Sequence, residues 1–240
     1  MDTDDSQLIP LLAAPPTTIG EVLQTLSAID TVCVDGDGLK WFNRLYMQVT
    51  QAVEDRVAAG GFQDPPWLVE LDVQFARLYL SSLGNYLAGS ACPHCWSILF
   101  DARTDARIAR IQFAMAGINA HINHDLPEAI VNTSTAMKTV PQHGTPQYTD
   151  YSGLNSTLDS LIQTAKTELG VRLLGDPLPP VSHLENTLAA WGTAAAREQA
   201  WNNSEVLWAI RAFPAAQTAI MGSLDGLSTF AGKAVLVPVP

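Results

Sequence analysis

Residues 111–130, IQFAMAGINAHINHDLPEAI, show most directly how this chain folds. Their apolar side chains recur at intervals of three and four residues, the spacing of one buried face of an α-helix. The apolar face consists of Ile111, Met115, Ile118 and Ile122. The same spacing starts about ten residues earlier, so we predict a helix that begins near residue 101 and runs up to Pro127.

Pro127 should interrupt this helix. A proline has no backbone N–H, and its ring collides with the carbonyl group four residues earlier, so it is unfavourable inside a helix and favourable in a first turn. We predict that the long helix ends or restarts here and that Pro127 opens a new short helix.

The helical spacing recurs along most of the chain. It predicts further helices at residues 18–29, 39–59, 64–87, 150–169, 183–200 and 203–224. No stretch alternates apolar and polar residues as a half-buried strand does, and no segment repeats along the chain. The sequence therefore predicts an all-α fold, an irregular bundle of about eight helices in a single domain at residues 17–240.

Other segments lack this periodicity. Residues 1–16 are rich in proline and acidic side chains, and we expect a flexible N-terminal arm there. Residues 89–96 are expected to be a connection, residues 138–149 a separator between two helical halves, and the final VLVPVP an extended tail.

The composition indicates a large core and excludes some partners. The 240 residues carry a net charge of −11, and 47% of them are hydrophobic, unlike a disordered chain. Lys and Arg are scattered, so no nucleic-acid partner is expected. We find no basic leader and no apolar run of membrane length, and the three cysteines are too few for a disulfide framework. We expect a cytoplasmic protein with no membrane partner, either a monomer or a simple homo-oligomer.

A polar cluster lies beside the apolar face of this helix. On a helical projection, His121, His124, Asp125 and Glu128 fall within about a third of the circumference. Imidazole titrates near neutral pH and binds divalent metals, and a neighbouring carboxylate fixes its tautomer, so this face is suited to acid–base chemistry or to metal binding. A structural explanation stays open, because Asp125 and Glu128 also have the spacing of a capped helix start.

Three segments carry a resemblance to a known family. FNRLYMQVT (42–50), FQDPPWLVELDVQFARLYL (62–80) and GINAHINHDLP (117–127) resemble DUF5995, a bacterial and fungal family of uncharacterised α-helical proteins. The resemblance spans roughly residues 40–165 and implies no mechanism. It marks five signature positions: Asp72, Asn119, His121, Asn123 and Asp125.

Asp72 stands among apolar residues on what should be the buried face of its helix, and a buried carboxylate is costly unless it is paired. We expect Asp72 to meet His121 and Asp125 across a helix interface. These residues and His124 would then form a pocket or a metal site. The structural alternative is a hydrogen bond from Asn119 or from a neighbouring helix end to Asp72.

Several other motifs give little indication of function. Cys92-Pro93-His94-Cys95 has CxxC spacing, but no second pair and no redox context accompany it, so we interpret it as a loop with ordinary thiols. Asp35-Gly36-Asp37-Gly38 is interpreted as a turn, and Ser182-His183-Leu184-Glu185 as a helix start. The remaining candidates, which are suited to the floor of a pocket, are Trp191, Trp201, Trp208, Arg197 and Arg211.

Two classes of function follow. The first is an enzyme with a small-molecule substrate in a pocket between helices, where His121 is the acid or base, Asp125 and Asn119 orient it, and Asp72 is a second carboxylate. Its reaction would be a cyclisation, isomerisation or elimination, or a hydrolysis if a divalent metal is bound. The alternative is a non-catalytic helical ligand-binding protein in which the cluster is structural.

Overall fold

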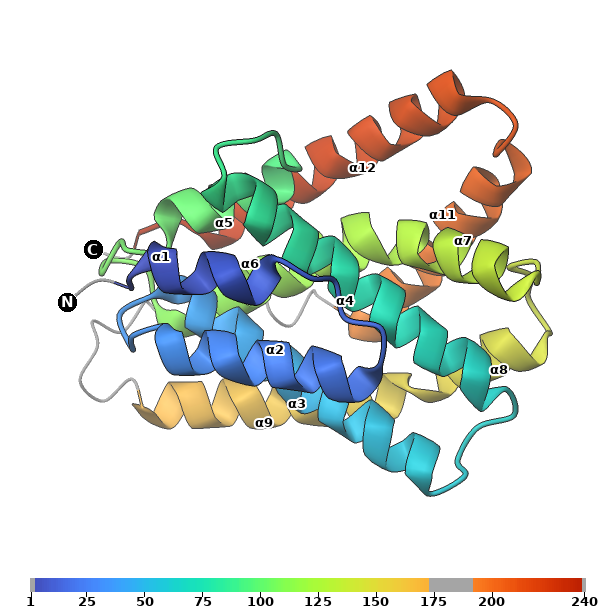
Figure 1. Ribbon diagram of the computed structural model, residues 1–240, viewed down its shortest axis with the longest axis horizontal. Coiled ribbons are helices and arrows are strands. Elements are labelled where there is room, and N and C mark those ends of the chain that lie inside the picture. The colour runs from blue at the N-terminus through green and yellow to red at the C-terminus, as the bar shows by residue number, and fades with distance from the viewer. Residues whose placement is uncertain (1–2, 173–191, 239–240) are drawn as a thin grey trace.

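The computed structural model describes residues 3–172 and 192–238, with the backbone alone for residues 165–172. The described chain forms one compact helical domain without a strand (Figure 1). Its elements are α1 (Asp5–Leu8), the 3₁₀ turn η1 (Ile9–Leu12), α2 (Ile19–Val32), α3 (Gly38–Ala58), α4 (Pro65–Leu87), α5 (His94–Ala102), α6 (Arg110–Ala120), the π-helical turn η2 (His121–Asp125), α7 (Leu126–Met137), α8 (Pro146–Gly153), α9 (Asn155–Arg172), α11 (Thr193–Ala209) and α12 (Pro214–Val235). The predicted all-α fold is confirmed. Within the described segments, no helix is both long enough and apolar enough to cross a membrane.

Local capping explains several of the predicted helix starts. The Thr18 hydroxyl accepts the N–H of Glu21, and the Glu21 carboxylate accepts the N–H of Thr17, so α2 begins with its first donors satisfied. Asp64 caps α4 by accepting the N–H of Trp67, with prolines in the first turn. These starts depend only on neighbouring residues, and the sequence placed them correctly.

The N-terminal segment differs from the expected aperiodic arm. Residues 5–12 are helical, and Leu8 is fully buried. Asp4 caps α1 by accepting the N–H of Ser6, and Asp5 forms an ion pair with Arg103, which is far away in the sequence. The acids that suggested a loose arm therefore cap and dock a short helical segment.

The segment before α6 also departs from the prediction. Residues 89–96 were expected to be a connection and the next helix to begin near residue 101, whereas α5 begins at His94 and α6 only at Arg110. Pro93 offers no side-chain cap. Instead, the Asp225 carboxylate of α12 accepts the N–H groups of His94 and Cys95. A residue from the far end of the chain thus caps α5, which local sequence could not indicate.

Pro127 lies in the first turn of α7, which begins at Leu126, so the helix restarts here as predicted, but without an intervening loop. α6, η2 and α7 follow one another without a break from Arg110 to Met137. In η2 the N–H of Leu126 bonds to the carbonyl of His121, five residues back, which is π-helical bonding. This local widening of the helix just before Pro127 accommodates a residue that an ordinary α-helix would not tolerate.

The long helix is the central element of the fold. It contacts α3, α5 and α12 through α6, and α4 and α11 through α7. Gly117 allows the closest approach, because a Cβ there would collide with the ring of Phe42 on α3. Gly38 at the start of α3 faces the ring of Phe113 in the same way. Both glycines are therefore required by the contact between α3 and α6.

The C-terminal half is only partly as predicted. The helix expected at 150–169 is divided into α8 and α9 at Leu154. Residues 183–191 of the helix expected at 183–200 lie outside the described residues, as do Trp191 and the motif at 182–185. α11 continues through the break expected near residue 202 and ends before Pro214, where α12 starts and runs to Val235. In Figure 1, α12 leans away from the bundle at the end that joins α11.

Candidate functional site

A buried carboxylate held by two histidines lies in the π-helical turn. Asp125 Oδ2 is 2.9 Å from His121 Nδ1, and Asp125 Oδ1 is 2.8 Å from His124 Nδ1. The indole N–H of Trp96 on α5 donates to Asp125 Oδ2 at 3.0 Å. Asp125 is 1% exposed and its backbone is helical, so its carboxylate is not a helix cap.

Burial and hydrogen bonding shift the pKa values of the three titratable groups in different directions. Burial lowers the pKa of His121, and the hydrogen bond and charge of Asp125 only partly oppose this. Burial also acts to lower the pKa of His124, but the bond to Asp125 and the charges of Asp125, Asp225 and Glu128 outweigh it and leave that pKa raised. Burial alone would raise the pKa of Asp125, whereas the hydrogen bonds from both histidines lower it.

A specific protonation pattern follows at neutral pH. The lowered pKa of Asp125 keeps it an anion, and the lowered pKa of His121 keeps that ring neutral, with its proton on Nδ1, where it donates to the carboxylate. The raised pKa of His124 favours its cationic form. The other ring nitrogen of His121, Nε2, therefore carries a free lone pair. A neutral imidazole oriented by a carboxylate in this way is a ready proton acceptor.

The Nε2 atom of His121 is buried and has no hydrogen-bond partner among the described residues. The ring stacks on Phe75 at a centroid distance of 3.4 Å and meets the edge of Tyr46 at 4.6 Å. His121 lines a cavity of about 60 Å³ whose other walls are Phe42, Leu45, Tyr46, Val49, Phe75, Ile118, Ile122, Leu158, Ile162, Thr193 and Arg197. The cavity is thus mostly apolar, with an imidazole and a guanidinium at its wall.

Asp72 borders a neighbouring cavity of about 40 Å³. Its side chain is buried, and Oδ2 has no hydrogen-bond partner within the described part of the chain. Burial, with a small contribution from the charge of Glu54, raises the pKa of Asp72 to about 7. Tyr46 and Phe75 line both cavities. In the described residues, no hydrogen bond or ion pair joins Asp72 to His121, Asp125 or Asn119, so the structure does not bring Asp72 into the cluster expected from the sequence.

Asn119 connects helices and does not orient His121. Its Nδ2 donates to the carbonyl of Ser228 on α12 at 2.6 Å, and its Oδ1 accepts from Asn123 at 3.0 Å. Asn119 is fully buried, and both ends of its amide are bonded. Its role in this fold is to fix α6 against α12.

The predicted metal ligands do not converge. His121 and His124 use their Nδ1 atoms on opposite oxygens of Asp125, and Asp72 lies at the other cavity. Within residues 3–164 and 192–238, whose side chains are described, no group of three or more His, Cys, Asp or Glu side chains is arranged to hold a metal ion. Cys92 and Cys95 are free thiols, and burial raises the pKa of both. No observation therefore supports a metal or redox site at either motif.

Arg197 is a feature of the site that the sequence suggested only as one of several residues for a pocket floor. It lines both cavities and is 5% exposed. Its Nε donates to Asn155 Oδ1 at 2.7 Å and its Nη2 to the Tyr151 carbonyl at 2.8 Å, while the guanidinium lies 4.0 Å from the centroid of the Tyr151 ring. Among the other residues considered for the floor, Trp201 is buried, and Arg211 lies over the ring of Trp208.

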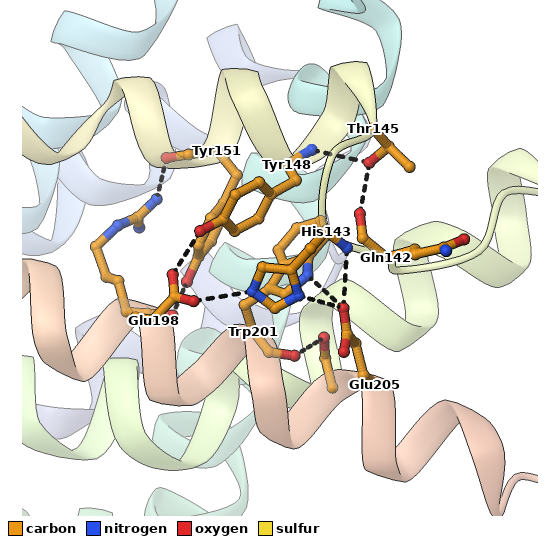
Figure 2. Close-up of polar contacts among 10 residues, drawn as sticks. Gln142, His143, Thr145, Tyr148, Tyr151, Glu198, Trp201 and Glu205 are labelled. Carbon is orange, nitrogen blue, oxygen red and sulfur yellow. Dashed lines mark hydrogen bonds and ion pairs between the residues drawn. The ribbon is translucent and has the colours of Figure 1, made fainter.

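A polar cluster on the outer side of α11 holds this helix in place (Figure 2). His143, in the loop before α8, contacts Glu205 through Nδ1 at 2.8 Å and Glu198 through Nε2 at 2.9 Å. Tyr148 donates to Glu198 and Trp201 donates to Glu205. Figure 2 shows His143 between the two glutamates. These bonds link α8 and its preceding loop to α11, which carries Arg197.

Together, the fold and site define an all-helical protein in which a histidine–aspartate pair borders a small interior cavity. The chain belongs to the family described as a family of unknown function, DUF5995, whose model matches residues 19–238. The match extends well beyond the three segments that carry the resemblance. No curated protein and no solved structure matches the chain.

Proposed function

We propose that this protein is an enzyme that removes a proton from a small organic substrate, with His121 as the general base. The observation that carries the proposal is the state of His121. Its Nδ1 is bonded to a buried carboxylate, and its Nε2 is buried at the wall of a cavity without a partner. An unsatisfied buried nitrogen costs stability, and such costs are retained most often where they serve chemistry.

The surroundings are suited to proton transfer. The lowered pKa of His121 keeps the imidazole unprotonated at neutral pH, and Asp125 stabilises the imidazolium that forms when Nε2 accepts a proton. His124 holds the other oxygen of Asp125 by a second hydrogen bond. Asp72, with a pKa of about 7, can hold a proton in the neighbouring cavity and return it. Isomerisation, elimination and cyclisation all need this pair of steps.

The size of the cavities limits the substrate. An apolar cavity of about 150 Å³ holds benzene, so cavities of about 60 and 40 Å³ suit groups of a few non-hydrogen atoms. A larger molecule would have to displace side chains. We therefore propose a small substrate, or a small reacting end of a larger one.

Deuterium exchange tests the proposal without knowledge of the substrate. The protein is incubated in D₂O with mixtures of small metabolites, and the recovered compounds are analysed by mass spectrometry. The wild-type protein should introduce deuterium at one carbon of at least one compound, whereas His121→Gln should not. Asn123→Gln, a change on the same helical segment away from the cavity, is the matched control and should retain exchange. Equal exchange with His121→Gln would overturn the assignment of the base.

The state of His121 can be measured directly. Nitrogen-15 NMR of the histidine rings should show His121 as the Nδ1–H tautomer, with a pKa below the ordinary 6.5, and His124 with a pKa above it. An Nε2–H tautomer, or an imidazolium at His121 at pH 7, would contradict the mechanism.

A second candidate is a non-catalytic ligand-binding protein in which the cluster is structural. It is favoured by the three donors on Asp125, one of which, Trp96, connects α5 to the long helix. This alternative predicts no deuterium exchange in any mixture, and a large loss of stability for His121→Gln.

A further inference from the structure

Arg197 brings a positive charge into the interior without a hydrogen-bonded carboxylate among the described residues. Burial lowers its pKa, and the charge of Asp159, an exposed residue of α9, opposes this only partly. Its two hydrogen bonds go to neutral acceptors, the Asn155 side chain and the Tyr151 carbonyl. Its Nη1 makes no hydrogen bond to the described residues. A buried cation is costly unless an anion compensates it. Within the described residues, the charge of the exposed Asp159 acts on Arg197 from a distance, and no anion bonds to the guanidinium directly.

The first turn of α11 borders the same cavity. Thr193 is the first residue of this helix, is buried, and lines the cavity with Arg197 and His121. The N-cap residue is Gly192, which has no side chain to accept the first N–H groups. The N-terminus of a helix carries a partial positive charge and exposed donors, and both favour an anion. Arg197 lies one turn further along, so the two positive features adjoin each other.

His121 supplies an independent sign of a ligand in this place. It is 3% exposed, and its Nε2 lacks a partner although the ring forms part of the cavity wall. Apart from these polar groups, the walls are aliphatic and aromatic, with Leu45, Phe75 and Ile162 among them. The cavity thus offers a positive end, a proton acceptor and an apolar surface.

We propose that the cavity binds the carboxylate of a small organic acid between Arg197 and the first turn of α11, with the carbon chain against the apolar wall and within reach of His121. This inference rests on the proposed function, for which it names the substrate class. A carboxylate matches the planar guanidinium, and its few atoms fit a cavity of about 60 Å³. A proton on the carbon next to a carboxylate is also the kind that a general base removes in an isomerisation or elimination.

Propionate is the probe for this site, with 1-propanol as a neutral analogue and inorganic phosphate as a larger anion. Calorimetry and NMR titration should show binding of propionate to the wild-type protein, and weaker or no binding of the other two. The largest propionate-induced shifts should appear at the amides of Thr193 and Ala194 and at the ring nitrogens of His121. Shifts confined to other residues, or tighter binding of phosphate, would overturn the proposal.

Two variants test whether the charge of Arg197 binds propionate. Arg197→Gln keeps a donor for Tyr151 and Asn155 but removes the charge, and it should weaken propionate binding about tenfold or more, as expected for loss of a charge-assisted bond. Arg211→Gln removes an exposed guanidinium from the turn after α11 and should leave binding unchanged. Equal binding by Arg197→Gln and wild type refutes the site. If Arg197→Gln does not fold, the propionate-induced NMR shifts of the wild-type protein still test whether propionate binds at this site.

The proposed propionate binding and the proposed proton removal can be refuted independently of each other. His121→Gln should still bind propionate, because the carboxylate contacts Arg197. Propionate binding without any deuterium exchange would refute the proposed function and leave the anion site. Exchange that requires His121, in a protein that does not bind propionate, would refute the anion site and leave the function.

Discussion

Replacing Asp72 by asparagine should stabilise this protein, and the gain should depend on pH. The carboxylate is buried at the small cavity beside Tyr46 and Phe75, and one oxygen has no partner among the described residues. Asparagine has nearly the same shape but no charge to bury. The substitution therefore removes the cost of ionisation while leaving the packing of α4 almost unchanged.

The size of the gain follows from the raised pKa. Burial raises the pKa of Asp72 from 3.8 to about 7, so the folded state holds this proton more tightly than the unfolded state does. The wild-type protein consequently loses stability as the pH rises from about 4 to 7, and the loss is complete above 7. At about 1.4 kcal/mol per pKa unit, Asp72→Asn should gain about 4 kcal/mol at pH 8 and about 2 kcal/mol at pH 5.

Thermal and urea denaturation at pH 5 and pH 8 measure both gains. For a domain of this size the gain at pH 8 corresponds to a rise in Tm on the order of 10 °C. Asp55→Asn, which removes an exposed carboxylate from α3, controls for the reduction of the net charge of −11. A variant that is destabilised, or equally stabilised at both pH values, would show that Asp72 has a partner and is not a buried, unpaired carboxylate.

Three further substitutions test the packing and the clusters. Asp125→Asn should cost about 3–5 kcal/mol in a urea titration, because it leaves buried donors without their anion, and a cost below 1 kcal/mol would contradict this. Gly117→Ala should lose about 1–3 kcal/mol of stability, because its Cβ would collide with the ring of Phe42. The control Gly226→Ala has open space around it and should gain stability. Losses of equal size in the two variants would refute the close contact. Bonds to two glutamates raise the pKa of His143, so the stability it contributes is complete below pH 6.5 and is lost as the pH rises through its folded-state pKa. His143→Gln should therefore lower stability more at pH 5.5 than at pH 8.5. An equal loss at both pH values would refute the contribution of these bonds.

The amino-acid sequence by itself determined the helical class, several helix starts and the local composition of the cluster. These features depend on residues close together in the chain. Thr18 and Asp64 cap helices a few residues away, and apolar spacing marks the buried faces. His121 and Asp125 are one turn apart, so the helical period alone placed them on a common face.

Tertiary packing decided the rest of the site. The third donor on Asp125 comes from Trp96, and the cap of α5 comes from Asp225, both from elements distant in sequence. The separation of Asp72 from His121 and the arrival of Arg197 at the cavity also depend on how whole helices pack. Because burial and hydrogen bonding set the pKa of each group, only the folded chain decides that the pKa of His121 is lowered and that of His124 is raised.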